Sequence, residues 1–240
     1  MENINQQIKK ESYFKFRNVD NSPQLDQKGF PVIYLKKILP KNKDAEILDI
    51  GCGYGNLIQQ IKNIGYKNVR GVDIEKESLD FCLKNNLDVE EIENIEDYAK
   101  KTSKKFDFAI MNHVLEHIKK DKIIETLQAI KSMLKENGSL YITTPNAQAR
   151  TGCYWAHEDF THELLFTSGS LFYVLKAAGF EKVQFIDPNG LENSRFIFFK
   201  KMLLNIYKWN DKFWNKITGG AYHPNSPIIY TWELKVIAHK

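Results

Sequence analysis

A short glycine-rich segment near residue 50 constrains the fold of this chain more than any other feature. Residues 47–57 read ILDIGCGYGNL, where an apolar run is followed by Gly51, Gly53 and Gly55. The run predicts a buried strand, and the apolar spacing over 57–64 predicts a helix. Glycine permits a tight turn and a close approach of the backbone to a ligand. A strand, a glycine loop and a helix in this order are typical of a nucleotide-binding site.

Strand and helix patterns alternate after residue 44, which predicts a doubly wound α/β fold with a mostly parallel sheet. A polar loop with two histidines is expected over 145–167, where the alternation stops. Strands are expected at 46–50, 69–73, 89–92, 106–111, 139–144, 183–186 and 228–238, and helices at 31–39, 57–64, 76–85, 97–101, 118–134 and 168–178.

Length and composition fit one α/β domain with additions. We divide the 240 residues into an arm and helix at 1–44 and a domain at 45–240 with an insert at 195–217. The net charge of +4 is too small to indicate a nucleic-acid-binding face. The three cysteines form no metal or disulfide pattern, so we expect a reducing cytoplasm. The sequence contains no run of 18 apolar residues, so no membrane-spanning helix is predicted.

The charges beside the glycine loop argue against a dinucleotide. The glycines follow G-x-G-x-G and not G-x-G-x-x-G, and Asp49 stands two residues before the first of them. A carboxylate about 4 Å from a pyrophosphate would be repelled by roughly 4 kcal/mol at an effective dielectric near 20. Asp73, at the end of the next strand, is placed to accept two ribose hydroxyls. The ligand is therefore expected to be an adenosine with positive charge, and S-adenosylmethionine fits.

Four ordered segments then carry a family resemblance: ILDIGCGYGN (47–56), GVDIEKESL (71–79), FDFAIMNHVLEHI (106–118) and GSLYITTPNA (138–147). Over about residues 45 to 190 the chain resembles the class I S-adenosylmethionine-dependent methyltransferases. The resemblance implies a seven-stranded sheet whose last strand, here 228–238, runs antiparallel to the rest. The stretch 160–180 resembles methyltransferases of surface-polysaccharide biosynthesis, such as that of capsules.

The resemblance also implies a set of cofactor contacts. Tyr13 or Phe14 of the arm is expected to cover the cofactor, Cys52 to be a small loop filler, and Gly55 either to line the loop or to allow helix packing. The implied contacts are Asp49, Gly51, Cys52 and Gly53 along the methionine part, Asp73 at the ribose, Ile74 and Ile95 at the adenine, and Asn112 under the methionine.

Two histidine-rich stretches are expected on the acceptor side. HVLEH (113–117) follows a strand, and on a helix His113, Glu116 and His117 would share one face. AHEDFTHELLFT (156–167) follows the fifth strand and contains His162. Strand ends of this kind meet at one sheet edge. His117 or His162 is predicted to take the proton of an acceptor hydroxyl or to bind that hydroxyl.

A divalent metal is the second interpretation of these residues. Two histidines and a carboxylate, with a loop histidine, suit such an ion. The small-RNA 3′-end 2′-O-methyltransferases are similar, with an E-x-x-E-H helix and a later histidine, although His113 stands here in place of the first Glu. The metal hypothesis names His113, Glu116, His117 and His162, and the alternative is that these residues only brace the helix start.

Several acceptors stay open. The main hypothesis is O-methylation of a saccharide or a saccharide substituent such as a phosphoramidate. The alternatives are a quinone-type small-molecule O-methyltransferase, an RNA 2′-O-methyltransferase, and a nucleotide-binding module without activity. TTPN (143–146) is not the N/D-P-P-Y/F signature of base-amino methyltransferases, which argues against nucleic-acid bases. No protein partner is implied.

The insert at 195–217 is basic and aromatic, with six Lys or Arg against one Asp. As a helix it would have an apolar face rich in Phe, Leu and Trp. Three interpretations stay open: contact with a membrane surface, a lid or homodimer contact, or a helix packed on the sheet edge with solvated lysines.

Overall fold

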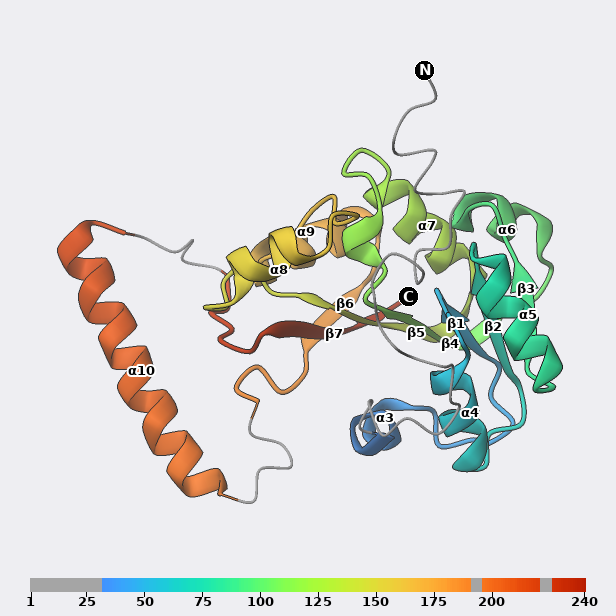
Figure 1. Ribbon diagram of the computed structural model, residues 1–240, viewed down its shortest axis with the longest axis horizontal. Helices are drawn as coiled ribbons and strands as arrows, with labels where there is room; N and C mark the ends of the chain where they lie inside the picture. Colours follow the sequence, from blue (N-terminus) through green and yellow to red (C-terminus); the bar gives the residue numbers. More distant parts are fainter. Residues whose placement is uncertain (1–31, 191–195, 221–225) are drawn as a thin grey trace. The chain divides into compact units, whose positions relative to one another are not determined.

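The computed structural model describes residues 32–190, 196–220 and 226–240 (Figure 1). Tyr13 and Phe14, expected to cover the cofactor, lie outside these ranges. The described residues form a seven-stranded sheet in the order β3-β2-β1-β4-β5-β7-β6. The strands are β1 (Ile47–Ile50), β2 (Val69–Asp73), β3 (Asp88–Glu91), β4 (Phe106–Asn112), β5 (Leu134–Pro145), β6 (Lys182–Phe185) and β7 (Glu233–His239). The helices are α3 (Val32–Ile38), α4 (Asn56–Asn63), α5 (Lys76–Lys84), α6 (Ile95–Lys101), the 3-10 turn η1 (Leu115–His117), α7 (Ile123–Met133), α8 (Gly152–Glu158), α9 (Ser168–Ala177) and α10 (Ile197–Thr218).

The strand pairing confirms the predicted fold class. β1 pairs in parallel with β2 and with β4, β2 pairs in parallel with β3, and β6 and β7 are antiparallel. The strand order reverses between β1 and β4, which is the topological switch point of the sheet. In open α/β sheets the ligand crevice lies beyond the carboxyl ends of the strands at this point.

Contacts along the chain define two compact units. The first contains the described part of Met1–Met111 together with Ala129–Leu140, and the second contains Asn112–Gln128 and Tyr141–Lys240. The glycine loop belongs to the first unit, and both histidine-rich stretches belong to the second. We describe each unit by itself.

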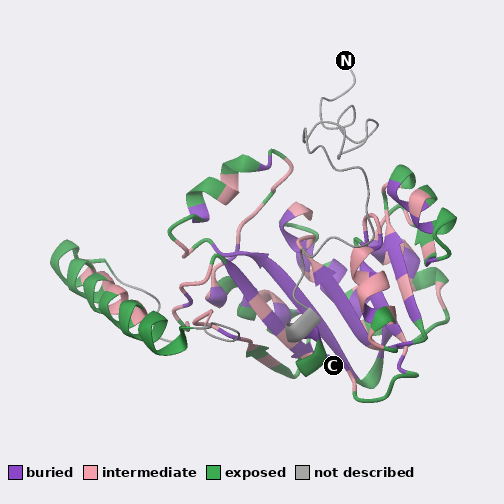
Figure 2. Cartoon of the chain, turned by 60° about the horizontal axis from the view of Figure 1, so that its bottom comes forward, coloured by how far each residue is buried: buried purple, intermediate pink, exposed green. Residues whose placement is uncertain are grey.

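The core of the first unit explains its strands. All four residues of β1 are buried, as expected for a central strand that is covered on both faces (Figure 2). Ile58 and Ile61 of α4 are fully buried, and they lie three residues apart on one face of that helix. The apolar spacing that predicted this helix therefore identified its packed face.

The core of the second unit is built from strand β7 and helix α9. Leu171 and Leu175 of α9 are fully buried, as are Leu234 and Val236 of β7. A capping box fixes the start of α9, since the side chains of Thr167 and Ser170 each bond the other's backbone amide. The predicted helix at 168–178 is thereby confirmed.

Two sequence predictions in the second unit are wrong in detail. The helix expected over 118–134 begins only at Ile123, and Leu115–His117 is a 3-10 helix and not part of an α-helix. His113 has a φ of 53°, in the left-handed region, which an α-helix does not allow. Segment 145–167 is not a loop throughout, because it contains α8.

The last strand also begins later than expected. β7 starts at Glu233 and not near Ile228. The reason is the side chain of Asn146, whose amide donates to the carbonyls of Ile229 and Thr231 at 2.8 Å each. These bonds satisfy backbone acceptors that a strand would use for its ladder, so this segment stays outside the sheet.

Candidate active site

The glycine loop after β1 is held in a conformation that other residues rarely adopt. Gly51, Gly53 and Gly55 have φ values of 72°, 49° and 74°. Any side chain there would be strained, which explains the glycine at each position. The backbone amides of Gly51 and Cys52 both donate to the carbonyl of Val72, at 2.8 and 3.2 Å, and so tie the loop to β2.

Asp73, at the carboxyl end of β2, is fixed by the backbone of two loops. Its carboxylate accepts from the amide of Gly53 at 2.7 Å and from the amide of Glu75 at 3.0 Å. Both oxygens are therefore positioned before any ligand arrives. Each retains a lone pair that can accept a further hydrogen bond.

Asp49 is a buried carboxylate that lacks a complete set of partners. Its side chain is 2% exposed, and Oδ2 has no hydrogen-bond partner among the described residues. Burial, and after it the charge of Asp73, raises the pKa of Asp49 to about 7. An unpaired buried carboxylate costs free energy. A cationic group placed beside it would remove that cost, so this site suits a cation-bearing ligand.

The other predicted cofactor residues differ in environment. Ile74 is 63% exposed at the end of β2, which leaves an apolar side chain open to a flat ligand. Ile95 is buried at the start of α6. Asn112 ends β4 in the second unit, where its side-chain oxygen accepts from the hydroxyl of Thr143.

Cys52 and Gly55 have roles in packing. Burial, then the charges of Asp49 and Asp73, raises the pKa of the Cys52 thiol above its usual range, so this thiol is not reactive. A Cβ at Gly55 would lie 2.4 Å from Cδ1 of Leu87. Gly55 thus permits close packing of the loop, which was one of its two predicted roles.

In the second unit, His113 lies between two carboxylates. Its Nδ1 is 3.2 Å from Glu116 and its Nε2 is 3.2 Å from Glu233. The ring stacks on Trp232 with centroids 5.5 Å apart. Burial lowers the pKa of His113, but the bonds to Glu116 and Glu233 outweigh it and raise the pKa to about 9. His113 is therefore an imidazolium at neutral pH.

His113→Ala is expected to destabilise the protein by about 3 kcal/mol at neutral pH. The substitution leaves the fully buried Glu116 and the neighbouring Glu233 without the cation between them. Urea unfolding checks this, with the exposed His157→Ala as the control. A loss no larger than that of the control would show that the ion pair contributes nothing to stability.

His117 and His162 form a pair whose Nδ1 atoms are both occupied. Nδ1 of His117 lies 2.8 Å from the Thr161 hydroxyl, which itself donates to Asp159. Nδ1 of His162 lies 2.7 Å from the carbonyl of Trp155. An oxygen that can only accept requires the proton on Nδ1, so Nε2 carries the lone pair in each neutral ring. Burial lowers the pKa of His117 below its usual value, which keeps that ring neutral at pH 7.

The structure brings together three of the four predicted metal ligands. Glu116, His117 and His162 each offer a ligand atom, and these atoms lie within 4.8 Å of one another. The rings of His117 and His162 are 4.8 Å apart between centroids. His113 is not in this group, because both of its nitrogens contact carboxylates.

Sequence reasoning missed several residues that hold the cluster. Glu233 and Trp232 reach His113 from 120 and 119 positions further along the chain, and no spacing in the sequence links them to it. Thr161 and Trp155 fix the two histidine rings. They lie near His162 in the sequence, but nothing in the residue pattern predicts which atoms they contact.

Comparison with known proteins places the chain in a family. Residues 3–185 match the family model described as a methyltransferase domain. The chain belongs to this family, and its fold is that of a class I S-adenosylmethionine-dependent methyltransferase. A methyltransferase from Archaeoglobus fulgidus superposes with a TM-score of 0.63 at 22% identity, covering 87% of this chain and 92% of that one.

Curated relatives match over a shorter range. The ubiquinone biosynthesis O-methyltransferase of Glaesserella parasuis serovar 5 is 33% identical over 115 residues, which cover 44% of this chain and 47% of the relative. The ribosomal protein L11 methyltransferase of Thermosipho melanesiensis is 31% identical over 113 residues, 45% of this chain and 40% of the relative. The chain thus spans about half the length of the curated relatives it matches.

Proposed function

We propose that the protein transfers the methyl group of S-adenosylmethionine to an oxygen atom of a saccharide or of a saccharide substituent. The observation that carries the choice of oxygen is the arrangement of His117 and His162. Each ring donates through Nδ1 to a fixed oxygen, so the Nε2 of each neutral ring carries the lone pair that can accept a proton.

The cofactor contacts follow from the charges of the first unit. The buried carboxylate of Asp49 matches the α-ammonium and sulfonium groups of S-adenosylmethionine. Asp73 accepts the ribose hydroxyls, and Ile74 packs on the adenine. Asn112, Ile95 and the loop residues Gly51, Cys52 and Gly53 complete the proposed set.

The chemistry of the transfer requires a base. The sulfonium already activates the methyl carbon, and the alignment of acceptor and methyl supplies most of the rate. An alcohol must also lose its proton as it attacks, and a neutral histidine can accept that proton. We assign this role to His162 or His117. An amine acceptor that is already deprotonated needs no such group.

A divalent metal fits the same residues. Glu116, His117 and His162 would hold it, and in each histidine the second nitrogen is already bonded to an oxygen, as is usual for metal-ligating histidines. Such an ion would lower the pKa of an acceptor hydroxyl. The carboxylate of Glu116 accepts from Thr144 at 3.1 Å and pairs with His113, which sets its orientation.

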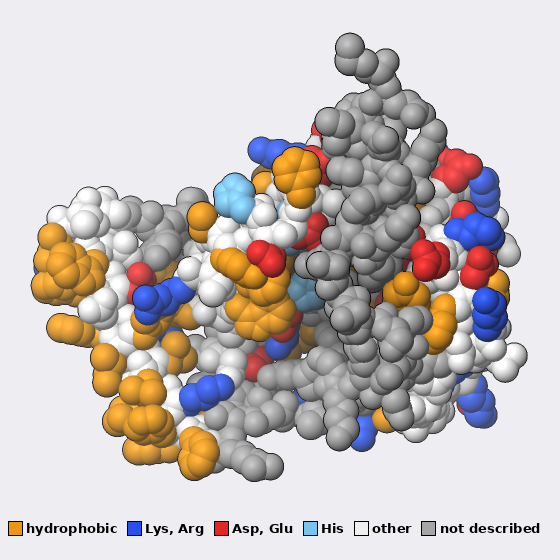
Figure 3. Space-filling view, in the orientation of Figure 1, with side chains coloured by type: hydrophobic (Ala, Val, Ile, Leu, Met, Phe, Trp, Pro, Cys, Tyr) orange, Lys and Arg blue, Asp and Glu red, His pale blue; other side chains and the backbone are white. Residues whose placement is uncertain are grey.

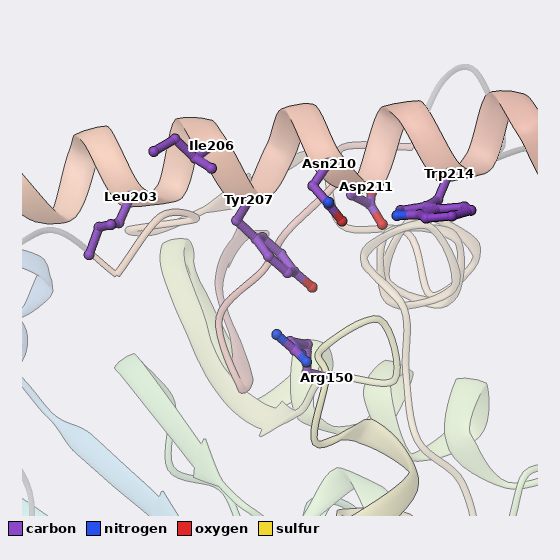
Figure 4. Close-up of a pocket in the computed structure, with 7 residues that line it drawn as sticks. All are labelled: Arg150, Leu203, Ile206, Tyr207, Asn210, Asp211 and Trp214. Atoms are coloured by element: carbon purple, nitrogen blue, oxygen red, sulfur yellow. The ribbon is translucent and has the colours of Figure 1, made fainter.

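A polar and aromatic cavity of about 510 Å³ in the second unit supports a saccharide acceptor (Figure 4). Arg150 points toward α10, and its guanidinium carbon lies 5.8 Å from the centroid of the Tyr207 ring. Aromatic faces suit sugar rings, and a guanidinium suits an anionic substituent. The full lining is Arg150, Leu203, Ile206, Tyr207, Asn210, Asp211 and Trp214.

The second candidate is a quinone-type O-methyltransferase. It is supported by the partial similarity to enzymes named ubiquinone biosynthesis O-methyltransferases. The same histidine pair would then act on a phenolic hydroxyl.

An acceptor screen with labelled methyl donor tests the proposal. Nucleotide sugars and phosphorylated capsule fragments are compared with catechol-type quinols and with RNA. We expect incorporation into a saccharide hydroxyl or substituent, whereas incorporation only into quinols or RNA would contradict it. Calorimetry with S-adenosylhomocysteine and with NADH tests the cofactor separately, and tighter binding of NADH would end the methyltransferase assignment.

A further inference from the structure

Helix α10 presents its apolar side away from the protein. A surface helix normally buries that side against its own core. α10 has 22 residues, and none of them is buried. Figure 2 shows it exposed around most of its circumference, and Figure 3 shows hydrophobic side chains gathered along it.

The side of α10 that meets the rest of the unit is mostly polar. Lys208 donates to the side chain of Asn189 at 2.7 Å, and Tyr230 donates to Asp211 at 3.1 Å. The ring of Tyr207 meets that of Tyr230 edge-on at 5.1 Å. The half-exposed positions of α10 lie on one side of the helix at helical spacing, and they are Leu204, Tyr207, Lys208, Asp211 and Asn215.

The opposite side is a continuous apolar stripe. The stripe has seven members, and after the adjacent pair Phe198 and Phe199 they follow one another at spacings of three or four residues, which places them on one side of a helix with 3.6 residues per turn. Each is between 44% and 83% exposed. The apolar stripe consists of Phe198, Phe199, Met202, Ile206, Trp209, Phe213 and Ile217.

The charge of the helix favours one occupant. α10 contains five lysines and one aspartate, a net charge of +4. Lys201, Lys212 and Lys216 are exposed and border the apolar stripe on one side. Pairing two copies through the stripe would bring two such charges together, whereas an anionic lipid surface neutralises them.

We propose that α10 lies on the surface of a membrane that contains anionic lipids. The apolar stripe enters the boundary between headgroups and acyl chains, and the lysines reach the phosphate groups beside it. The lysines are spread along the whole helix, which suits an orientation in the plane of the surface. Among the described residues, no helix is both long and apolar enough to cross a membrane. The proposal does not depend on which acceptor is methylated.

Vesicle flotation tests the proposal with the full chain. We expect binding to vesicles of phosphatidylcholine with phosphatidylglycerol, and little binding to phosphatidylcholine alone. Raised salt should weaken the binding, because it screens the lysines. Equal binding to both kinds of vesicle, or none to either, would overturn the proposal.

Two variants separate the apolar and the charge contributions. Met202→Ser with Trp209→Ser and Phe213→Ser removes the centre of the apolar stripe, and Lys201→Glu with Lys212→Glu and Lys216→Glu reverses the charge of the residues that border it. Each should lower binding at least about tenfold. All six side chains are exposed, so no core packing is lost.

Matched controls use exposed residues of the same types elsewhere. Leu83→Ser changes an apolar residue that is 56% exposed. Lys104→Glu with Lys119→Glu and Lys120→Glu makes the same change of charge. Both should bind as the unchanged protein does. Light scattering measures whether the protein is a dimer in solution. If it is a dimer that the serine variant dissociates, and if it does not bind vesicles, the apolar stripe contacts a second copy of the chain and the proposal is overturned.

Discussion

His162→Ala is expected to lower methyl transfer about 100-fold or more while affinity for S-adenosylhomocysteine stays within a few-fold. A positioned general base typically contributes a factor of 10² to 10⁴. The proposed cofactor residues Asp49 and Asp73 belong to the first unit, and His162 belongs to the second. Turnover and calorimetric affinity are measured on the same preparation.

A second substitution distinguishes chemistry from structure. The side chain of His162 is only 6% exposed, and its Nδ1 bonds the carbonyl of Trp155. His162→Asn keeps an N–H donor for that carbonyl but has no Nε2. The Asn variant should fold as the unchanged protein does and remain as inactive as the Ala variant. Recovered turnover in the Asn variant would mean that His162 only braces the segment.

Chelation tests the metal at the same site. If Glu116, His117 and His162 hold an ion, a chelator should abolish turnover and added divalent metal should restore it. Unchanged turnover after chelation would exclude a role for the metal in methyl transfer, and the histidine pair would then act only as base and hydroxyl binder.

Asp49→Asn is expected to weaken the binding of S-adenosylhomocysteine about 100-fold or more. The substitution removes the carboxylate that we propose to face the α-ammonium group, and hydrogen bonds between charged partners are the strong ones. Calorimetry measures the loss. Binding within a few-fold of that of the unchanged protein would place the cationic end of the cofactor elsewhere.

Because the pKa of Asp49 is raised, the affinity for the cofactor should depend on pH. The carboxyl titrates at about 7 in the folded protein, so below that value a proton competes with the ligand's cation. Affinity should fall about tenfold for each pH unit below about 7, and the Asn variant should lose this slope.

The same shift predicts the effect on stability. The folded pKa of about 7 exceeds the ordinary value of 3.8 for aspartic acid, so burying this carboxyl costs no stability below about pH 3.8, where it is protonated in both the folded and the unfolded state. As the pH rises from there to about 7, the protein loses stability progressively. Asp49→Asn should therefore resist urea at least as well as the unchanged protein at about pH 8 without cofactor. Asp107→Asn is the matched contrast. It removes the charge that pairs with Lys135 and leaves only a neutral acceptor for the amide of Glu46, so it should lose stability but keep cofactor affinity.

Much of the first unit could be read from local patterns. Three local patterns predicted its start, and each involves only a few neighbouring residues: the apolar run at 47–50, the glycines after it, and the helically spaced apolar residues after residue 56. The structure contains the strand, the loop and the helix at these places. Asp49 and Asp73 were identified because a parallel strand places its carboxyl end beside its neighbour's. Such features depend on backbone geometry and period, which a sequence displays directly.

The second unit was less predictable. HVLEH was placed on a helix, where His113, Glu116 and His117 would share one face, but contacts with distant residues hold it in another conformation. Glu233 lies 120 residues from His113, and the carbonyl of Thr143 accepts from the backbone amide of His113 at 3.0 Å. These partners hold the turn with His113 in its left-handed conformation.

The sequence by itself determined the class of fold, the glycine loop with Asp49 and Asp73 beside it, and the basic aromatic character of the segment 195–217. Only the tertiary structure decided which nitrogen of each histidine is occupied, that His113 is an imidazolium between two carboxylates, and that the apolar side of α10 faces outward. The physical reason is range. Apolar periodicity, glycine turns and the ends of strands depend on residues that are close together in the chain. The protonation of a buried ring and the exposure of a helix face depend on groups that folding brings together from distant positions.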